Sequence, residues 1–344
     1  MKLYTDDGYL NIEAILATKL PYILCVGGRA IGKTYGALEY VIDHEVPFIF
    51  MRRTQSQCDI ISRDEFSPFR SLMADREGLY ITARSITKYN AGFYRGELQD
   101  GKIVPTGAPI GYTMALSTVS NLRGFDASQV KLLIYDEFIP EKHERPLKNE
   151  GAAFLNAIET IGRNRELKGE DPLQVLCLAN ANDLGNPVFK ELKIISKVEK
   201  MMRKGQSYSL DYQRGIGIFL LKDSPISKRK AKTALYLLSG EGEFSEMSLS
   251  NDFADLKHGS VKTQPIKEYV PIVTLGEITF YKHKSNGKYY CTTMRVGSPE
   301  IYEPNDTDIR RFMLKYNWIY RAYMQDLILF EDTTAEIIYN QYIS

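Results

Sequence analysis

Residues 27–34 read Gly-Gly-Arg-Ala-Ile-Gly-Lys-Thr, a complete G-x-x-x-x-G-K-T phosphate loop. An apolar run, 22–26, precedes this loop and a helix-like stretch follows it, which is the context that the motif requires. We expect Lys33 to reach the β and γ phosphates of a nucleotide and the Thr34 hydroxyl to ligate Mg²⁺. The residues expected to bind the nucleotide are Gly27, Gly28, Arg29, Ala30, Ile31, Gly32, Lys33 and Thr34.

Two consecutive acids, Asp136 and Glu137, follow the apolar run 131–135. The carboxyl edge of a parallel sheet is where ligands bind, so we expect both acids beside the phosphate loop. Asp136 would hold Mg²⁺ through its water shell, and Glu137 would act as the general base toward water. Their distance along the chain from the loop is typical of nucleoside triphosphatases with an extra strand between the two motifs. The alternative is a solvated pair that merely ends a strand.

Asn180 ends a third apolar run, 174–179. On a strand beside the nucleotide strands, its amide would lie near the γ-phosphate as a sensor and hydrogen-bond the attacking water. The alternative is a turn residue, because Asn180-Ala181-Asn182-Asp183 is also turn-like.

Arginines are the next candidates, since phosphoryl transfer spreads negative charge over the γ-phosphate and a guanidinium from a neighbouring subunit can stabilise it. Arg163, Arg123 and Arg29 all fit this role, and each could instead be a solvated surface arginine. Arg52 and Arg53 could border an adenine pocket, and the other interpretation is that these two arginines form salt bridges with acidic residues.

The pattern of elements predicts an α/β fold with a mainly parallel sheet in residues 1–222. Expected strands are 22–26, 47–51, 111–117, 131–135 and 174–179, with an antiparallel hairpin over 80–95 inserted beside them. Expected helices are 32–43, 60–73 and 150–162.

Composition changes after residue 222. Residues 223–250 predict a small helical linker that opens with the basic cluster 227–232, which could contact nucleic-acid phosphates or be a solvated helix face. Residues 251–344 predict a small α+β domain with strands at 269–275, 277–282 and 289–296. The Asn286-Gly287 turn supplies the positive φ angles of a hairpin. Helices are expected at 308–322 and 334–342.

Bulk properties exclude several classes of protein. The chain has 344 residues, a formal net charge of +1 and four widely spaced cysteines. No global field draws it onto nucleic acid, so such contacts must come from local patches. We expect buried thiols rather than disulfides, no structural zinc, and no membrane-spanning segment.

Five segments together resemble one family: 27–34, Phe-Ile-Phe-Met-Arg-Arg at 48–53, Tyr-Asp-Glu-Phe-Ile at 135–139, Arg-Asn-Arg-Glu at 163–166 and Cys-Leu-Ala-Asn-Ala at 177–181. In this order they look like the DNA-packaging motor ATPase, or encapsidation protein, of small short-tailed phages that replicate by protein priming. This family is related to terminase large-subunit ATPases. Residues 246–249 and the C-terminal hairpin also fit.

The resemblance implies a RecA-like P-loop ATPase of the additional-strand (ASCE) class, and a C-terminal RNase H-like domain that has lost its nuclease site. It implies a homomeric ring, typically pentameric, on the portal of a procapsid in the host cytoplasm, driving double-stranded DNA inward with ATP and Mg²⁺. The resemblance is compatible with a chain that is monomeric in isolation. Some members of the family dock through a packaging RNA. Arg163 matches the family's trans arginine finger. Arg123 stands where the family has a lysine acting across the interface.

Two other functions stay open from the sequence. One is a terminase-like ATPase with an active C-terminal nuclease. The other is a nucleotide-gated assembly factor without productive hydrolysis, against which Glu137 argues.

Overall fold

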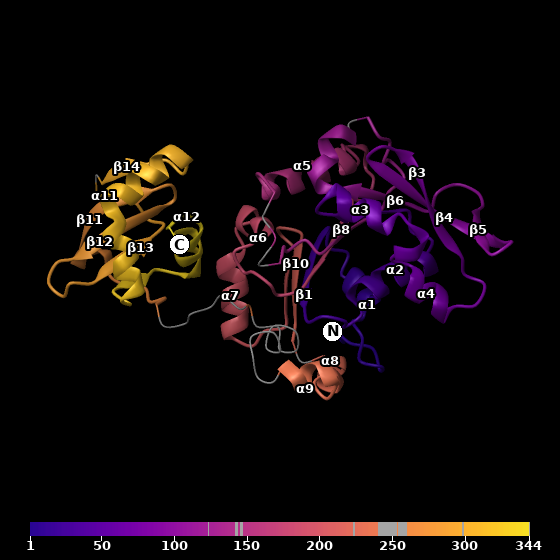
Figure 1. Cartoon of the computed structure of the whole chain (residues 1–344), viewed down its shortest axis with the longest axis horizontal. Helices are drawn as coiled ribbons and strands as arrows, with labels where there is room; N and C mark the ends of the chain where they lie inside the picture. Colours follow the sequence, from indigo (N-terminus) through magenta and orange to yellow (C-terminus); the bar gives the residue numbers. More distant parts are fainter. Residues whose placement is uncertain are drawn as a thin grey trace. The chain divides into compact units, whose positions relative to one another are not determined.

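The computed structural model describes residues 1–122, 124–141, 144, 147–222, 224–239, 253, 260–297 and 299–343. The chain divides into two compact units (Figure 1): Met1–Leu192 with Met201–Ala254, and Lys193–Lys200 with Asp255–Ser344. The boundaries expected from the sequence, at 222 and 250, stay a prediction.

The first unit is built on a ten-stranded sheet with the order β3-β4-β6-β2-β7-β8-β1-β10-β9, in which β5 pairs with β4. Its strands are β1 (Tyr22–Gly27), β2 (Phe48–Arg52), β3 (Ile81–Thr87), β4 (Asn90–Gln99), β5 (Lys102–Pro105), β6 (Gly111–Ala115), β7 (Leu132–Asp136), β8 (Gln174–Ala179), β9 (Tyr208–Asp211) and β10 (Ile216–Leu221). The six strands from β6 to β10 in this order are parallel, and antiparallel partners flank them. The central strands are nearly wholly buried because they are apolar on both faces.

Helices of the first unit connect and cover these strands. They are α1 (Ile12–Leu16), α2 (Lys33–Asp43), α3 (Gln55–Ile61), α4 (Arg70–Asp75), α5 (Glu150–Gly162), α6 (Pro187–Glu191), α8 (Pro225–Lys230) and α9 (Ala234–Ser239), with α7 (Ile195–Arg203) crossing the division between units. In α2, the apolar face of Ala37, Leu38 and Val41 belongs to the same core as Ile23 and Cys25 of β1. This packing fixes both ends of the phosphate loop.

The mixed α/β sheet and its five expected parallel strands are confirmed, as is the hairpin, now β3 and β4. The single helix expected over 60–73 is wrong. There α3 ends at Ile61, a short 3₁₀ turn covers Asp64–Phe66, and α4 begins at Arg70. Pro68 lies in the gap, where its missing N–H and its fixed φ interrupt a helix. The buried strand β10 was not foreseen, although its pairing with β1 completes the sheet around the loop.

The second unit holds a five-stranded mixed sheet in the order β14-β11-β12-β13-β15. Its elements are β11 (Tyr269–Leu275), β12 (Ile278–His283), β13 (Tyr289–Thr292), β14 (Glu300–Tyr302), β15 (Ile328–Phe330), α11 (Asp306–Met324) and α12 (Thr333–Ile343). The expected hairpin is confirmed, with Gly287 at φ 73° between β12 and β13. In the core of the second unit, Phe280 packs against Phe312 and Tyr339. The short parallel edge strands β14 and β15 were not foreseen.

All four cysteines are buried free thiols, as expected. None of the helices in the described part of the chain has the length and apolar character needed to cross a bilayer. No group of three or more His, Cys, Asp or Glu side chains among the described residues is arranged to hold a metal ion. Residues 246–249 lie outside the described residues.

Candidate functional site

The phosphate loop turns tightly between β1 and α2. A Cβ at Gly27 would lie 2.7 Å from the Leu221 side chain on β10, so only glycine allows this approach. Gly32 has φ 84°, the left-handed conformation that glycine adopts without strain. Ala30 has φ 57°, which costs a residue with a Cβ about 1–2 kcal/mol. The loop is therefore held in a strained shape, as is common at ligand sites.

Lys33 points back across this loop and is almost fully buried. Its Nζ donates to the backbone oxygens of Gly27 (3.0 Å) and Gly28 (2.6 Å) and to Oδ1 of Asn180 (3.1 Å). Burial lowers the pKa of Lys33 to about 8, while the Asp136 carboxylate acts in the opposite direction. The ammonium group is thus oriented by acceptors and remains mostly charged at neutral pH.

Thr34 and Asp136 meet at the edge of the sheet. The Thr34 hydroxyl donates to Oδ1 of Asp136 at 3.0 Å, and the second carboxylate oxygen of Asp136 accepts from Arg52 at 2.7 Å. A hydroxyl and a carboxylate oxygen are the hard ligands that Mg²⁺ prefers. These two side chains would therefore hold Mg²⁺ beside a bound nucleotide.

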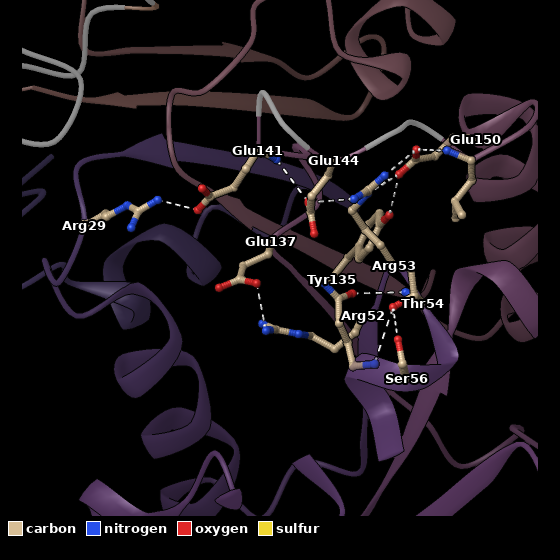
Figure 2. Close-up of polar contacts among 12 residues, drawn as sticks. Arg29, Arg52, Arg53, Thr54, Ser56, Tyr135, Glu137, Glu141, Glu144 and Glu150 are labelled. Carbon is tan, nitrogen blue, oxygen red and sulfur yellow. Dashed lines mark hydrogen bonds and ion pairs between the residues drawn. The ribbon is translucent and has the colours of Figure 1, made fainter. Parts of the chain in front are cut away.

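Glu137 follows β7 in a left-handed backbone conformation, with φ 56°. Its Oε2 accepts from Arg52 at 2.8 Å (Figure 2), and its side chain is 53% exposed. Partial desolvation raises the pKa of Glu137 above its ordinary value, Arg52 opposes the rise, and Asp136 adds to it. A raised pKa together with access to solvent suits a group that accepts a proton from water.

These groups line one cavity of about 350 Å³. Its walls are formed by Arg29, Ala30, Gly32, Lys33, Thr34, Tyr35, Asp136, Glu137, Glu141, Ala179 and Asn180. A buried ammonium, backbone of the loop and a hydroxyl–carboxylate pair are the donor set that a triphosphate with Mg²⁺ requires. The residues present therefore fit that ligand.

The strand order explains how Asn180 reaches this cavity. Strand β8 lies between β1 and β7, so its carboxyl end lies between the phosphate loop and the two acids. The structure thus brings Asn180 to Lys33 at the edge of the cavity, and its role as a sensor stays a prediction.

Arg53 does not line the cavity. Its guanidinium is buried in a bidentate pair with Glu150 (2.6 and 3.1 Å) and a further pair with Glu144 (2.9 Å), as Figure 2 shows. This is the ion-paired alternative, and Arg52 is the arginine that faces the acids instead. Sequence reasoning considered Arg52 beside an adenine pocket and missed its place beside the two acids. The signal that could have found it is the alternation of successive side chains at the end of a strand.

Arg29 extends from the phosphate loop and pairs with Glu141 (Figure 2). Arg163 follows α5 with φ 49°, and its half-exposed side chain donates to the Phe125 oxygen at 2.7 Å. It does not line the cavity of its own chain. Arg123 lies outside the described residues.

A parallel α/β sheet with a phosphate loop after one strand and two acids after another defines the P-loop class of nucleotide-binding folds. Residues 5–280 match the sequence profile of the family described as Podovirus DNA encapsidation protein (Gp16). The match covers most of the chain, so this protein belongs to that family.

Individual relatives agree with the family. The chain is 27% identical over 255 residues to the DNA packaging protein of Bacillus phage PZA, covering 73% of this chain and 67% of the relative. It is 27% identical over 250 residues to that of Bacillus phage phi29, covering 71% and 66%. The matches span about two thirds of each relative. The fold matches a chain of the bacteriophage Phi-29 viral genome packaging motor assembly with a TM-score of 0.67 and 19% identity, over 97% of this chain and 98% of that one. The chain is thus homologous to phage DNA-packaging proteins.

Proposed function

We propose that this protein is an ATP hydrolase that drives double-stranded viral DNA into a preformed procapsid. The observation that carries the proposal is one cavity in which Lys33, Thr34, Asp136, Glu137 and Asn180 converge from three neighbouring parallel strands. The family membership supplies the DNA-packaging context.

Bound ATP with Mg²⁺ supplies the transferable γ-phosphoryl group. Lys33 would orient the phosphates, and Thr34 and Asp136 would hold the metal. Glu137 accepts the proton of the attacking water, which Asn180 orients by hydrogen bonding. In the described structure Arg52 pairs with both acids but with only one carboxylate oxygen of Glu137, and the half-exposed side chain leaves the other oxygen open to the attacking water.

We propose that Arg163 completes the site of a neighbouring subunit. Its side chain is half exposed and lies away from its own cavity, as an arginine acting in trans requires. The proposed assembly is a homomeric ring, pentameric by family resemblance, on the portal of a procapsid in the host cytoplasm. The proposal leaves open whether a packaging RNA takes part, and it is compatible with a monomeric chain in isolation. Arg123 is proposed to act across the same interface.

We further propose that the second unit is the RNase H-like domain without a nuclease site. Its mixed sheet, together with α11 and α12 in the described residues, supports this assignment. Incubation of the protein with plasmid and Mn²⁺ tests it, because linear product would instead indicate an active nuclease.

The decisive experiment measures phosphate release by the purified protein alone, with DNA, and with DNA plus procapsids. We expect turnover to rise in the complete mixture. Glu137→Gln should lower turnover by about 10²–10⁴-fold while keeping ATP affinity, because only the proton acceptor is removed. Equal turnover in the wild type and Glu137→Gln would contradict the proposed mechanism.

A further inference from the structure

The basic helix α8 contacts the phosphate loop from outside the cavity. Nζ of Lys230, the last residue of α8, donates to the backbone oxygen of Arg29 at 2.8 Å. Its ammonium also lies 5.1 Å from the ring centroid of buried Tyr236 on α9, which orients the side chain. The side chain at 230 is therefore directed at the loop rather than outward as on a solvated helix face.

A second contact of the same kind comes from the N-terminal segment. The Leu10 N–H donates to the backbone oxygen of Ile31 at 2.9 Å. The backbone oxygens of two loop residues, Arg29 and Ile31, thus accept hydrogen bonds from groups that lie outside the cavity.

Because the peptide bond is planar, a hydrogen bond to a loop carbonyl also fixes the direction of the next N–H group. In a trans peptide the C=O of one residue and the N–H of the next point in opposite directions. The oxygen of Arg29 is bound to Lys230, so the N–H of Ala30 is directed to the other side. The same reasoning applies to Ile31 and the N–H of Gly32. Ala30 and Gly32 both line the cavity.

The two outer segments are also joined to each other. The Ser224 hydroxyl donates to the backbone oxygen of Gly8 at 3.2 Å, and the Arg229 guanidinium donates to the backbone oxygen of Asp7. Pro225 packs so closely on Gly8 that a Cβ there would lie 2.7 Å from the proline Cβ. Residues 7–10 and 224–230 therefore form one unit, which we call the outer clamp.

We propose that Lys230, through the outer clamp, is a positioning residue that keeps the N–H groups of the phosphate loop turned toward the nucleotide. This inference rests on the proposed function, because it assumes that a phosphate occupies the cavity. A flipped Arg29–Ala30 peptide would present a carbonyl oxygen, which repels phosphate instead of binding it. Movement of α8 would release this peptide. The position of α8 would therefore change the affinity for the nucleotide, and nucleotide binding would in turn favour the docked position of α8.

The test compares Lys230→Met with Lys228→Met. Lys228 is on the same helix and exposed, and within the described residues its side chain makes no hydrogen bond or ion pair. When the Ala30 N–H is no longer held toward the cavity, ATP loses one hydrogen bond to a charged phosphate oxygen. Lys230→Met should therefore weaken ATP binding by about tenfold, measured by calorimetry. Lys228→Met should bind as the wild type does, and Lys230→Arg should restore most of the affinity.

Two further readouts separate positioning from simple stability. The Tm of the free chain should differ little between the two methionine variants, and Lys230→Ala, which also removes the N–H donor, replaces Lys230→Met if that chain does not fold. Hydrogen exchange at 224–230 should slow on ATP binding in the wild type and Lys228→Met but not in Lys230→Met. Equal ATP affinity of Lys230→Met and the wild type would overturn this inference alone. A folded wild type that binds no ATP would overturn the proposed function as well.

Discussion

Arg52 and Arg53 are adjacent, have identical side chains, and end in opposite surroundings. The Arg52 side chain is 15% exposed and pairs with Asp136 and Glu137 at the cavity. The Arg53 side chain is 2% exposed and pairs with Glu150, which is fully buried, and with Glu144. A strand directs successive side chains to opposite faces, so one arginine joins the site and the other joins the core. Residue type alone therefore does not separate a functional arginine from a structural one.

A second pair at the end of α5 repeats the contrast. Arg163 is half exposed, whereas Arg165 is 9% exposed and donates to the backbone oxygens of Gly162, Val130 and Ile161. The comparison predicts that one member of each pair affects turnover and the other affects stability.

The largest effect is expected for Arg163→Ala. Loss of a trans arginine should lower turnover in assembled motors by about 10³-fold or more, while nucleotide affinity and the Tm stay near those of the wild type. Steady-state phosphate release and calorimetry measure both quantities. Rings mixed with Glu137→Gln subunits should regain activity, because each variant supplies what the other lacks. Full turnover by isolated monomers would show that no neighbour is needed.

Arg53→Met should have the next largest effect, and on stability rather than chemistry. It leaves the buried Glu150 carboxylate without its bidentate partner, which should cost about 3–5 kcal/mol of unfolding free energy. Urea denaturation measures the change. The double variant Arg53→Met/Glu150→Leu should recover most of the loss, because no buried charge remains unpaired. A single variant as stable as the wild type would remove the contrast between the two arginines.

Arg52→Met should act mainly through Glu137. Arg52 opposes the rise in the pKa of Glu137, so its removal should raise that pKa further. A general base is active when deprotonated, so the acid limb of the pH–turnover profile should move to higher pH. We expect a smaller loss of unfolding free energy than for Arg53→Met, since Glu137 is half exposed and the buried Asp136 keeps its hydrogen bond from Thr34. An unchanged acid limb would indicate that Glu137 is not the titrating base.

The smallest effect concerns Lys33. Its pKa is lowered to about 8, so the charged form is lost as the pH rises through that value instead of near the ordinary value for lysine. ATP affinity should therefore fall by about tenfold between pH 7 and pH 9, which binding titrations across that range can measure. Lys228→Met serves as a control with the same pH dependence. A flat profile would mean that the charge on Lys33 does not contribute to binding.

The motifs predicted the site because local rules act over a few residues. A G-x-x-x-x-G-K-T loop between an apolar strand and a helix rarely arises by chance, and acids after a buried strand must lie at the edge of a sheet. Asn180 followed from the same rule. The helix expected over 60–73 failed at Pro68. Strand β10 was missed although 216–221 is an apolar run like the predicted strands, and its place beside β1 became known only from the structure.

By itself the sequence determined the α/β class, the phosphate loop and the acids, since backbone chemistry and strand burial are written in short stretches of residues. Only the tertiary structure decided that β8 lies between β1 and β7, that Arg52 rather than Arg53 faces the acids, and that Lys230 holds a loop 201 residues earlier in the chain. These facts depend on which distant segments pack together, and that packing depends on the free energy of the whole fold rather than on any one segment.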